Sequence, residues 1–386
     1  MSARVLLVGI GGLGPWVLER LVRSDAVGGV VAADVDGARA AAVAGGTRLG
    51  TTLERRPVAV EATALDLMDA DAVARLLQER EIDLIVQAGS LLPVQRWWSI
   101  AALPDAGPRL QRAGLGPWLA LQLLLPLSLA RAIERCGWQG TLLNLSYPDA
   151  VNAVIARTTA VTPAGAGNVS LLAAAVRQAV AEQEGCRPDE VEVALSTHYA
   201  HVRWAMGGGE RPRRHGVLRV LRDGADLTDR LDPFELLRRG GALIPWGEAS
   251  HPLTAASVVR HVELLLGERA GAEHMPGPCG LVGGYPVRVG RDGVVVDPPP
   301  GTTVDALRVV QEETQQEDGI AAIAADGTVT FTDEAAEQMR SLFGAASAEL
   351  HPDDVEEQAR RLLAALDGFG TGGAATAPLR NSTNRK

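Results

Sequence analysis

Short apolar runs alternate with amphipathic segments over the first 160 residues of the chain. The runs are typical of buried parallel strands and lie at 4–9, 29–34, 57–65, 83–87 and 141–145. Apolar residues at helical spacing predict helices between them, at 16–22, 71–79 and 115–136. We expect the last of these helices to be interrupted near Pro126, because proline cannot donate a backbone hydrogen bond. This alternation predicts an α/β fold whose N-terminal part is a Rossmann domain with a doubly wound parallel sheet.

The second half of the chain has a less regular pattern. Its predicted elements are helices at 169–183 and 255–266, a strand at 191–195, hairpins at 287–296 and 320–331, and a helical stretch at 335–366. This mixture favours a C-terminal α+β substrate domain. We therefore divide the chain into a dinucleotide-binding domain (1–160), a substrate domain (161–345), and a C-terminal helix with a disordered tail (346–386).

The first predicted strand runs into a glycine-rich turn. Gly9-Ile10-Gly11-Gly12-Leu13-Gly14 fits the pattern G-x-G-x-x-G between a strand and a helix, and Asp34 follows twenty residues later. In this context the glycines let a pyrophosphate approach the backbone at the start of a helix. A carboxylate at the end of the second strand accepts hydrogen bonds from the ribose hydroxyls and repels a 2′-phosphate. The pattern predicts NAD as the cofactor and makes NADP less favoured, although Arg39 lies nearby.

Two further acids follow the third predicted strand. Asp66 is a candidate for contact with the adenine end of the cofactor, and Asp69 is placed equally well to cap the helix that follows it.

Composition excludes several classes of function. The net charge of −10 argues against a nucleic-acid or membrane-surface binder. Three widely spaced cysteines predict free thiols in a reducing cytoplasm, and we expect no metal site, since no His/Cys/Asp cluster has ligand spacing. Lysine occurs once, at Lys386, which argues against mechanisms that use a Tyr-x-x-x-Lys pair.

From Leu84 onward the order of several short motifs resembles the lactate/malate dehydrogenase superfamily. Leu84-Ile-Val-Gln-Ala-Gly89 is similar to the strand beneath the nicotinamide ribose, and this similarity implies cofactor contacts from Ala88 and Gly89. The remaining motifs are Leu142–Val151, which contains Asn144 and Tyr147-Pro148, the turn Gly165-Ala-Gly-Asn168, the strand before His198, the helix at 254–266 and the segment 285–293. The first 90 residues also resemble the saccharopine-dehydrogenase-like reductases, through Ala64-Leu-Asp66-Leu-Met-Asp69.

The dehydrogenase resemblance implies a set of catalytic residues. His198 would be the acid/base at the reacting carbon, with a structural histidine as the alternative and His201 as its substitute. Asn144 would bind the reacting oxygen or the cofactor ribose. Arg96 and Arg109, in the loop after Gly89, would polarise and enclose an acidic substrate.

The chain departs from the family at two positions of this set. The family's orienting Asp and carboxylate-binding Arg are replaced by Leu171 and Ala174.

These observations favour an NAD(P)-dependent oxidoreductase acting on a C–O or C–N bond of a polar metabolite, a class that includes carboxylate-bearing substrates. One alternative is a redox-neutral lyase, epimerase or glycosidase-like enzyme that keeps NAD bound and oxidises its substrate transiently. Another is a non-catalytic dinucleotide sensor. We expect a small-molecule substrate and a homodimer.

Overall fold

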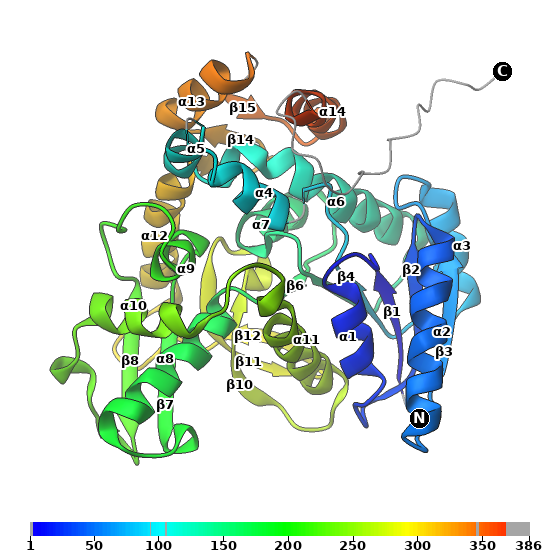
Figure 1. Cartoon of the computed structure of the whole chain (residues 1–386), viewed down its shortest axis with the longest axis horizontal. Helices are drawn as coiled ribbons and strands as arrows, with labels where there is room; N and C mark the ends of the chain where they lie inside the picture. The colour runs from blue at the N-terminus through cyan, green and yellow to red at the C-terminus, as the bar shows by residue number, and fades with distance from the viewer. Residues whose placement is uncertain (1–2, 93, 105, 345–346, 368–386) are drawn as a thin grey trace.

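The computed structural model describes residues 3–92, 94–104, 106–344 and 347–367. Its central sheet has six parallel strands in the order β3-β2-β1-β4-β5-β6, the order of a dinucleotide-binding fold (Figure 1). The strands are β1 (Ala3–Val8), β2 (Val27–Asp34), β3 (Ala59–Ala64), β4 (Leu84–Gln87), β5 (Thr141–Asn144) and β6 (Ala164–Gly165). The predicted α/β class and the Rossmann sheet are confirmed.

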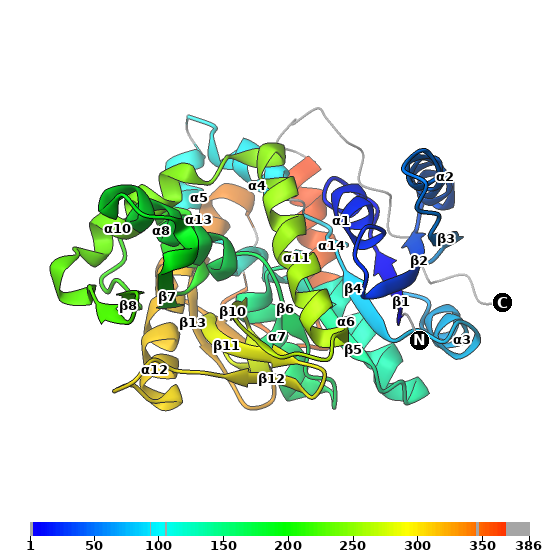
Figure 2. The same ribbon diagram turned by 90° about the horizontal axis from the view of Figure 1, so that it is seen from below.

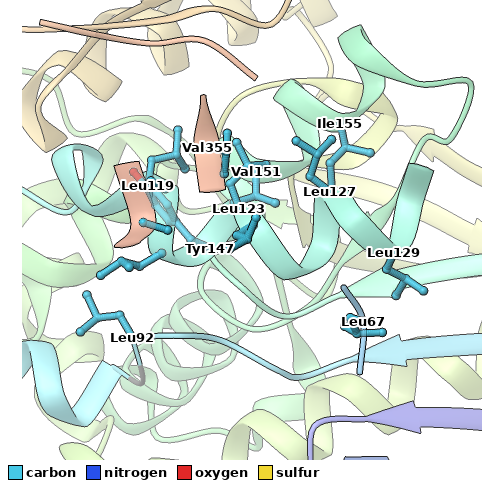
Figure 3. Packing of buried hydrophobic residues seen from close by; sticks show 14 of the residues in the cluster. Leu67, Leu92, Leu119, Leu123, Leu127, Leu129, Tyr147, Val151, Ile155 and Val355 are labelled. Carbon is cyan, nitrogen blue, oxygen red and sulfur yellow. The ribbon is translucent and has the colours of Figure 1, made fainter. Parts of the chain in front are cut away.

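Helices cover both faces of this sheet. Alternate side chains of β1 point to opposite faces, so Val5 and Leu7 join one hydrophobic core while Leu6 and Val8 join the other. The first core includes residues of α1 (Gly14–Leu21), α2 (Gly37–Leu53) and α11 (His251–Leu266). The second includes residues of α3 (Ala70–Glu79), α6 (Leu119–Cys136) and α7 (Pro148–Thr158), and Figure 3 shows its α6 leucines around Tyr147.

The expected interruption of the helix at Pro126 does not occur. Helix α6 continues through Pro126, which leaves the carbonyl of Gln122 without its helical donor. The Ser146 hydroxyl, just beyond β5, lies 2.9 Å from that carbonyl and 2.6 Å from Oε1 of the same residue, so its one hydrogen is shared between two acceptors of Gln122. A donor from outside the helix thus reaches the carbonyl that the proline leaves free.

Helix α6 and the short turn before it form the most apolar long segment of the chain. Among the described residues, one helix, Gly116–Cys136, is both long enough and apolar enough to cross a membrane. However, 83% of its most apolar window is buried inside the protein. This segment is therefore a core helix.

Among the described residues, the second half adds three antiparallel sheets, two of which lie beside the Rossmann sheet (Figure 2). The first contains β7 (Val191–Ser196), β8 (Val217–Arg222) and β9 (Ala225–Asp226), and α8 (Val169–Glu184) contacts β7 and α10 (Pro233–Leu243). The second contains β10 (Gly271–Pro276), β11 (Gly284–Gly290) and β12 (Gly293–Val296). Two further helices are α9 (Tyr199–Ala205) and α12 (Val304–Thr314). The predicted α+β character is confirmed.

The C-terminal region is not one helical stretch, as 335–366 was expected to be. Helix α13 (Asp333–Phe343) ends at Gly344, whose φ of +68° suits a left-handed cap, and α14 (Val355–Asp367) starts after a short strand. That strand, β15 (Glu349–Leu350), pairs with β14 (Val329–Phe331), which pairs with β13 (Ile320–Ile323). This sheet includes residues on both sides of the proposed boundary at 345/346, and the predicted tail at 368–386 lies outside the described residues.

The C-terminal unit of residues 320–367 packs on the loop that follows β4. That loop carries α4 (Val94–Ala101) and α5 (Gly107–Ala113). Helix α13 contacts α5 and α14 contacts α6, as Figure 1 shows at the top of the molecule.

Candidate dinucleotide and redox site

The glycine-rich turn has the geometry that a dinucleotide requires. A side chain at Gly9 would collide with the backbone of Gly89 at the end of β4, and one at Gly14 would collide with the Gly9 carbonyl. A Cβ atom at Gly11, by contrast, would meet no described atom within 4 Å. Gly9 and Gly14 therefore allow strand and helix to approach, whereas Gly11 leaves open space above the turn.

The start of α1 is available to an anion. Its N-cap residue is Leu13, which makes no side-chain hydrogen bond to the described chain, and Gly11 and Gly12 are exposed. The first amide groups of a helix lack partners within the helix and attract phosphate. Open space above Gly11 and the amino end of α1 thus coincide at the predicted pyrophosphate position.

Asp34 lies at the end of β2 and faces this turn. Its Oδ2 accepts the Ile10 amide at 2.7 Å and its Oδ1 accepts the Asp36 amide at 2.9 Å. The Arg39 guanidinium lies 3.4 Å from Oδ1. These bonds fix the carboxylate, and its remaining lone pairs can accept ribose hydroxyls.

A histidine that sequence reasoning left without a role borders the same turn. His251 is the first residue of α11, and its Cε1 lies 2.9 Å from the position of a Cβ atom on Gly12. Burial lowers the pKa of His251 below its ordinary value, so the ring is neutral beside the turn. Only the packing of α11 on α1 brings it there.

Of the other predicted cofactor contacts, some lie beside the glycine-rich turn and others bond to backbone amides of the chain. The Ala88 amide donates to Val8 at 2.7 Å, which holds Ala88 and Gly89 beside the glycine turn. Asp66 accepts the Met68 amide at 2.9 Å, and Asp69 caps α3 through the amides of Asp71 and Ala72.

Asn144 is fully buried and its amide group bonds to the chain itself. Its Nδ2 donates to Ser146 and to Asn152, at 3.0 and 2.9 Å, and its Oδ1 accepts the Ser146 amide at 3.0 Å. Both amide hydrogens are used, so the described structure gives Asn144 the role of fixing the turn after β5.

His198 begins α9 and is fully buried. Its Nδ1 accepts the Ala200 amide at 3.2 Å, so the neutral ring carries its proton on Nε2. Nε2 is buried and has no hydrogen-bond partner among the described residues. Burial and the nearby Arg203 lower the pKa of His198 to about 3, so this environment favours a neutral donor over a proton-exchanging base.

His201, the suggested substitute for His198, is bonded at both ring nitrogens. Its Nδ1 accepts the His198 amide at 3.2 Å, and its Nε2 lies 2.7 Å from the Arg214 carbonyl. Burial lowers the pKa of His201 to about 4.

Arg96 and Arg109 contact the C-terminal unit. Arg96 lies 3.3 Å from Asp367 of α14, and Arg109 donates to the side chain of Gln338 in α13 at 2.9 Å. The predicted substrate-enclosing arginines thus hold the loop after β4 against α13 and α14.

A buried cluster of ionisable side chains lies behind His198. Asp318, which is fully buried, accepts the Tyr147 hydroxyl at 2.6 Å and the Leu115 amide at 2.9 Å, and it pairs with Arg203 at 3.3 Å. Arg203 also donates to the Gln111 carbonyl at 2.8 Å and is 3% exposed. Asp318 thus joins the C-terminal half to the turn after β5 and to α9.

Asp149 is the second acid of this cluster. It stands in the first turn of α7, and its carboxylate accepts the Tyr199 amide at 3.0 Å and the side-chain amide of Asn168. Burial, and secondarily the charge of Asp318, raise the pKa of Asp149 to about 7. Two residues with strained backbone lie next to this acid. Tyr147, two positions before it, has a φ angle of +41°, and Asn168, whose side chain donates to it, has a φ angle of +43°.

The sequence contained one signal for Asp149 that was not used. It follows directly on Tyr147-Pro148 in the segment that resembles the dehydrogenases. No local pattern marks Asp318 or Arg203, because their partners lie far away in the chain.

The described residues contain no group of three or more His, Cys, Asp or Glu side chains that could hold a metal ion.

Solved structures similar to this chain are lactate and malate dehydrogenases. The malate dehydrogenase of Picrophilus torridus, in its apo form, has a TM-score of 0.59 at 15% identity, covering 82% of this chain and 97% of its own. The minor L-lactate dehydrogenase of Enterococcus mundtii has a TM-score of 0.57 at 15% identity, covering 82% and 96%. The lactate dehydrogenase of Eimeria maxima, solved with NADH and oxamate, has a TM-score of 0.55 at 13% identity, covering 97% and 98%.

The chain has the lactate/malate dehydrogenase fold. No protein-family model and no curated protein matches the sequence. At 13–15% identity this similarity concerns the fold alone. It confirms the expected resemblance to the lactate/malate dehydrogenases at the level of the fold. The resemblance to saccharopine-dehydrogenase-like reductases stays a prediction.

Proposed function

We propose that this protein is an NAD-dependent oxidoreductase that acts on a C–O or C–N bond of a small polar metabolite. The observation that carries the proposal is the turn at Gly9–Gly14, which combines two glycines required by packing with open space above Gly11. Asp34, fixed at the end of β2, favours NAD over NADP because its carboxylate repels a 2′-phosphate. The Eimeria maxima structure with this fold contains NADH.

The bound cofactor would extend across the carboxyl ends of the strands. In a doubly wound sheet each half binds one mononucleotide, so the residues after β1–β3 would hold the adenosine half and those after β4–β6 the nicotinamide half. The nicotinamide accepts or donates a hydride when it is bound. The substrate would then meet the residues that follow β5 and begin α9.

His198 would act on the substrate as a hydrogen-bond donor. Its buried Nε2–H lacks a partner in the described chain, and a carbonyl or hydroxyl oxygen of a substrate would satisfy it. A neutral imidazole can polarise a carbonyl without changing its own charge. The acid/base role expected for His198 is therefore replaced in this proposal by an orienting role.

A pair of glycine substitutions tests the cofactor site. Gly11→Ala introduces a methyl group into open space, so it should leave the melting temperature of the free protein unchanged and weaken NAD⁺ binding at least about ten-fold. Gly46→Ala is a matched control in α2, where an added Cβ also meets no described atom within 4 Å. Calorimetric titration with NAD⁺ and NADP⁺ should show tighter binding of NAD⁺ in the wild type and in Gly46→Ala. Equal NAD⁺ affinity in Gly11→Ala and the wild type would refute the proposal.

A further inference from the structure

We propose that Asp149 is the group that holds the proton of the redox reaction, with its ionisation coupled to the charge of the nicotinamide ring. This inference rests on the proposed function. Oxidation of a hydroxyl sends a hydride to the dinucleotide and releases the hydroxyl proton as the carbonyl forms. The Asp149 carboxylate takes up that proton, and the carboxyl group returns it when the carbonyl is reduced.

The charge balance of the buried cluster selects Asp149 over Asp318. Among the described residues, the cluster contains one ion pair, which joins Arg203 to Asp318. Asp318 also accepts the Tyr147 hydroxyl and the Leu115 amide, and all three donors stabilise its ionised form. In the part of the chain that the structure describes, Asp318 has a paired cation and Asp149 has only neutral donors. The ionised form therefore costs more at Asp149, and the proton goes there.

Asp149 also stands where the nicotinamide half of the cofactor ends. It lies five residues beyond β5, at the carboxyl end of the β4–β6 half of the sheet. Its partners Tyr199 and Asn168 belong to the two turns in which the dehydrogenase resemblance places substrate-binding residues. His198, the next candidate, does not take up a second proton, because burial and the positive charge of Arg203 lower its pKa to about 3.

The charge of the cofactor supplies the coupling. The nicotinamide ring is positive in NAD⁺ and neutral in NADH. An ionised Asp149 therefore favours binding of NAD⁺ over NADH by charge attraction, whereas a protonated Asp149 carries no charge and has no such preference. Burial raises the pKa of Asp149 to about 7, which puts the change within the neutral range. The other ionisable groups that face Asp149 are Asp318, Tyr147, Tyr199 and, from β11, Tyr285, and Arg203 pairs with Asp318. The tyrosines have pKa values raised by burial, so they stay neutral there.

The test measures the two dissociation constants between about pH 6 and pH 8 and needs no substrate. In the wild type the ratio Kd(NAD⁺)/Kd(NADH) should fall at least about ten-fold as pH rises, because a nearby opposite charge shifts a carboxyl pKa by about one unit or more. Asp149→Asn should make this ratio independent of pH. The control Asp229→Asn removes an exposed carboxylate from the turn after β9 and should behave as the wild type does.

Infrared spectroscopy of the wild-type protein provides a second readout, which can be measured even if the Asp149→Asn variant does not fold. The wild-type protein should show a protonated-carboxyl C=O band that disappears as pH rises through about 7, and Asp149→Asn should lack it. Absence of that band in the wild type, or its persistence in Asp149→Asn, overturns the assignment. Binding of both dinucleotides with a pH-independent ratio overturns this inference alone, whereas failure of the wild type to bind either one overturns the proposed function.

Discussion

Replacing Arg203 with methionine should lower the free energy of unfolding by about 3–5 kcal/mol, the usual cost of breaking a buried ion pair from one side. Arg203 and Asp318 are 3% and 0% exposed, and their side chains lie 3.3 Å apart. The guanidinium also donates to the carbonyls of Gln111 and Glu317, at 2.8 and 3.1 Å. Methionine fills similar volume but leaves the Asp318 carboxylate buried without its cation.

Urea-induced unfolding of the wild type and the variant at pH 7 measures this difference. The matched control is Arg219→Met, whose pair with Asp226 is 3.0 Å long but has side chains 29% and 47% exposed. Such a surface pair contributes about 0–1 kcal/mol, so the control should stay within that range of the wild type.

A double-mutant cycle with Asp318→Asn separates the pair from other losses. If the two side chains interact as the structure indicates, the double variant should be more stable than the sum of the single effects, by at least about 1 kcal/mol. Strict additivity, or a loss for Arg203→Met no larger than that for Arg219→Met, would refute the view that this pair joins the C-terminal half to α9.

Two other predictions concern the interior around the same site. Ser146→Ala removes the donor to the Gln122 carbonyl that Pro126 leaves free, and should cost about 1–3 kcal/mol in chemical unfolding. Ser128→Ala in the same helix should cost less, since that hydroxyl meets the Met68 sulfur, and a larger effect there would contradict the reasoning. Because the folded-state pKa of Asp149 is raised to about 7 from 3.8, stability should fall as pH rises from about 4 to 7 and then level off. Asp149→Asn should flatten that contribution, and an unchanged pH profile of the melting temperature would show that Asp149 does not titrate in this range.

The sequence by itself determined five strands of the first half and the glycine-rich turn, but not α2, α4, α5 or α7. Apolar runs of strand length and the spacing from Gly9 to Asp34 depend on local rules, because a buried parallel strand needs apolar side chains on both faces and a tight turn needs glycine. These local signals correctly predicted β1 to β5 and the turn around Gly11. Pro126 misled the prediction because the donor that compensates for it, Ser146, comes from another element.

Tertiary structure decided which side chains meet at the candidate redox site. The sequence gives no sign that Arg96 and Arg109 contact α14 and α13, whose residues come more than 200 positions later. Asp318 reaches Tyr147 across 171 positions of the chain. Contacts over such separations leave no periodic trace in a sequence. Local patterns specify strands and turns, whereas the pairing of buried charges follows from the packing of whole elements.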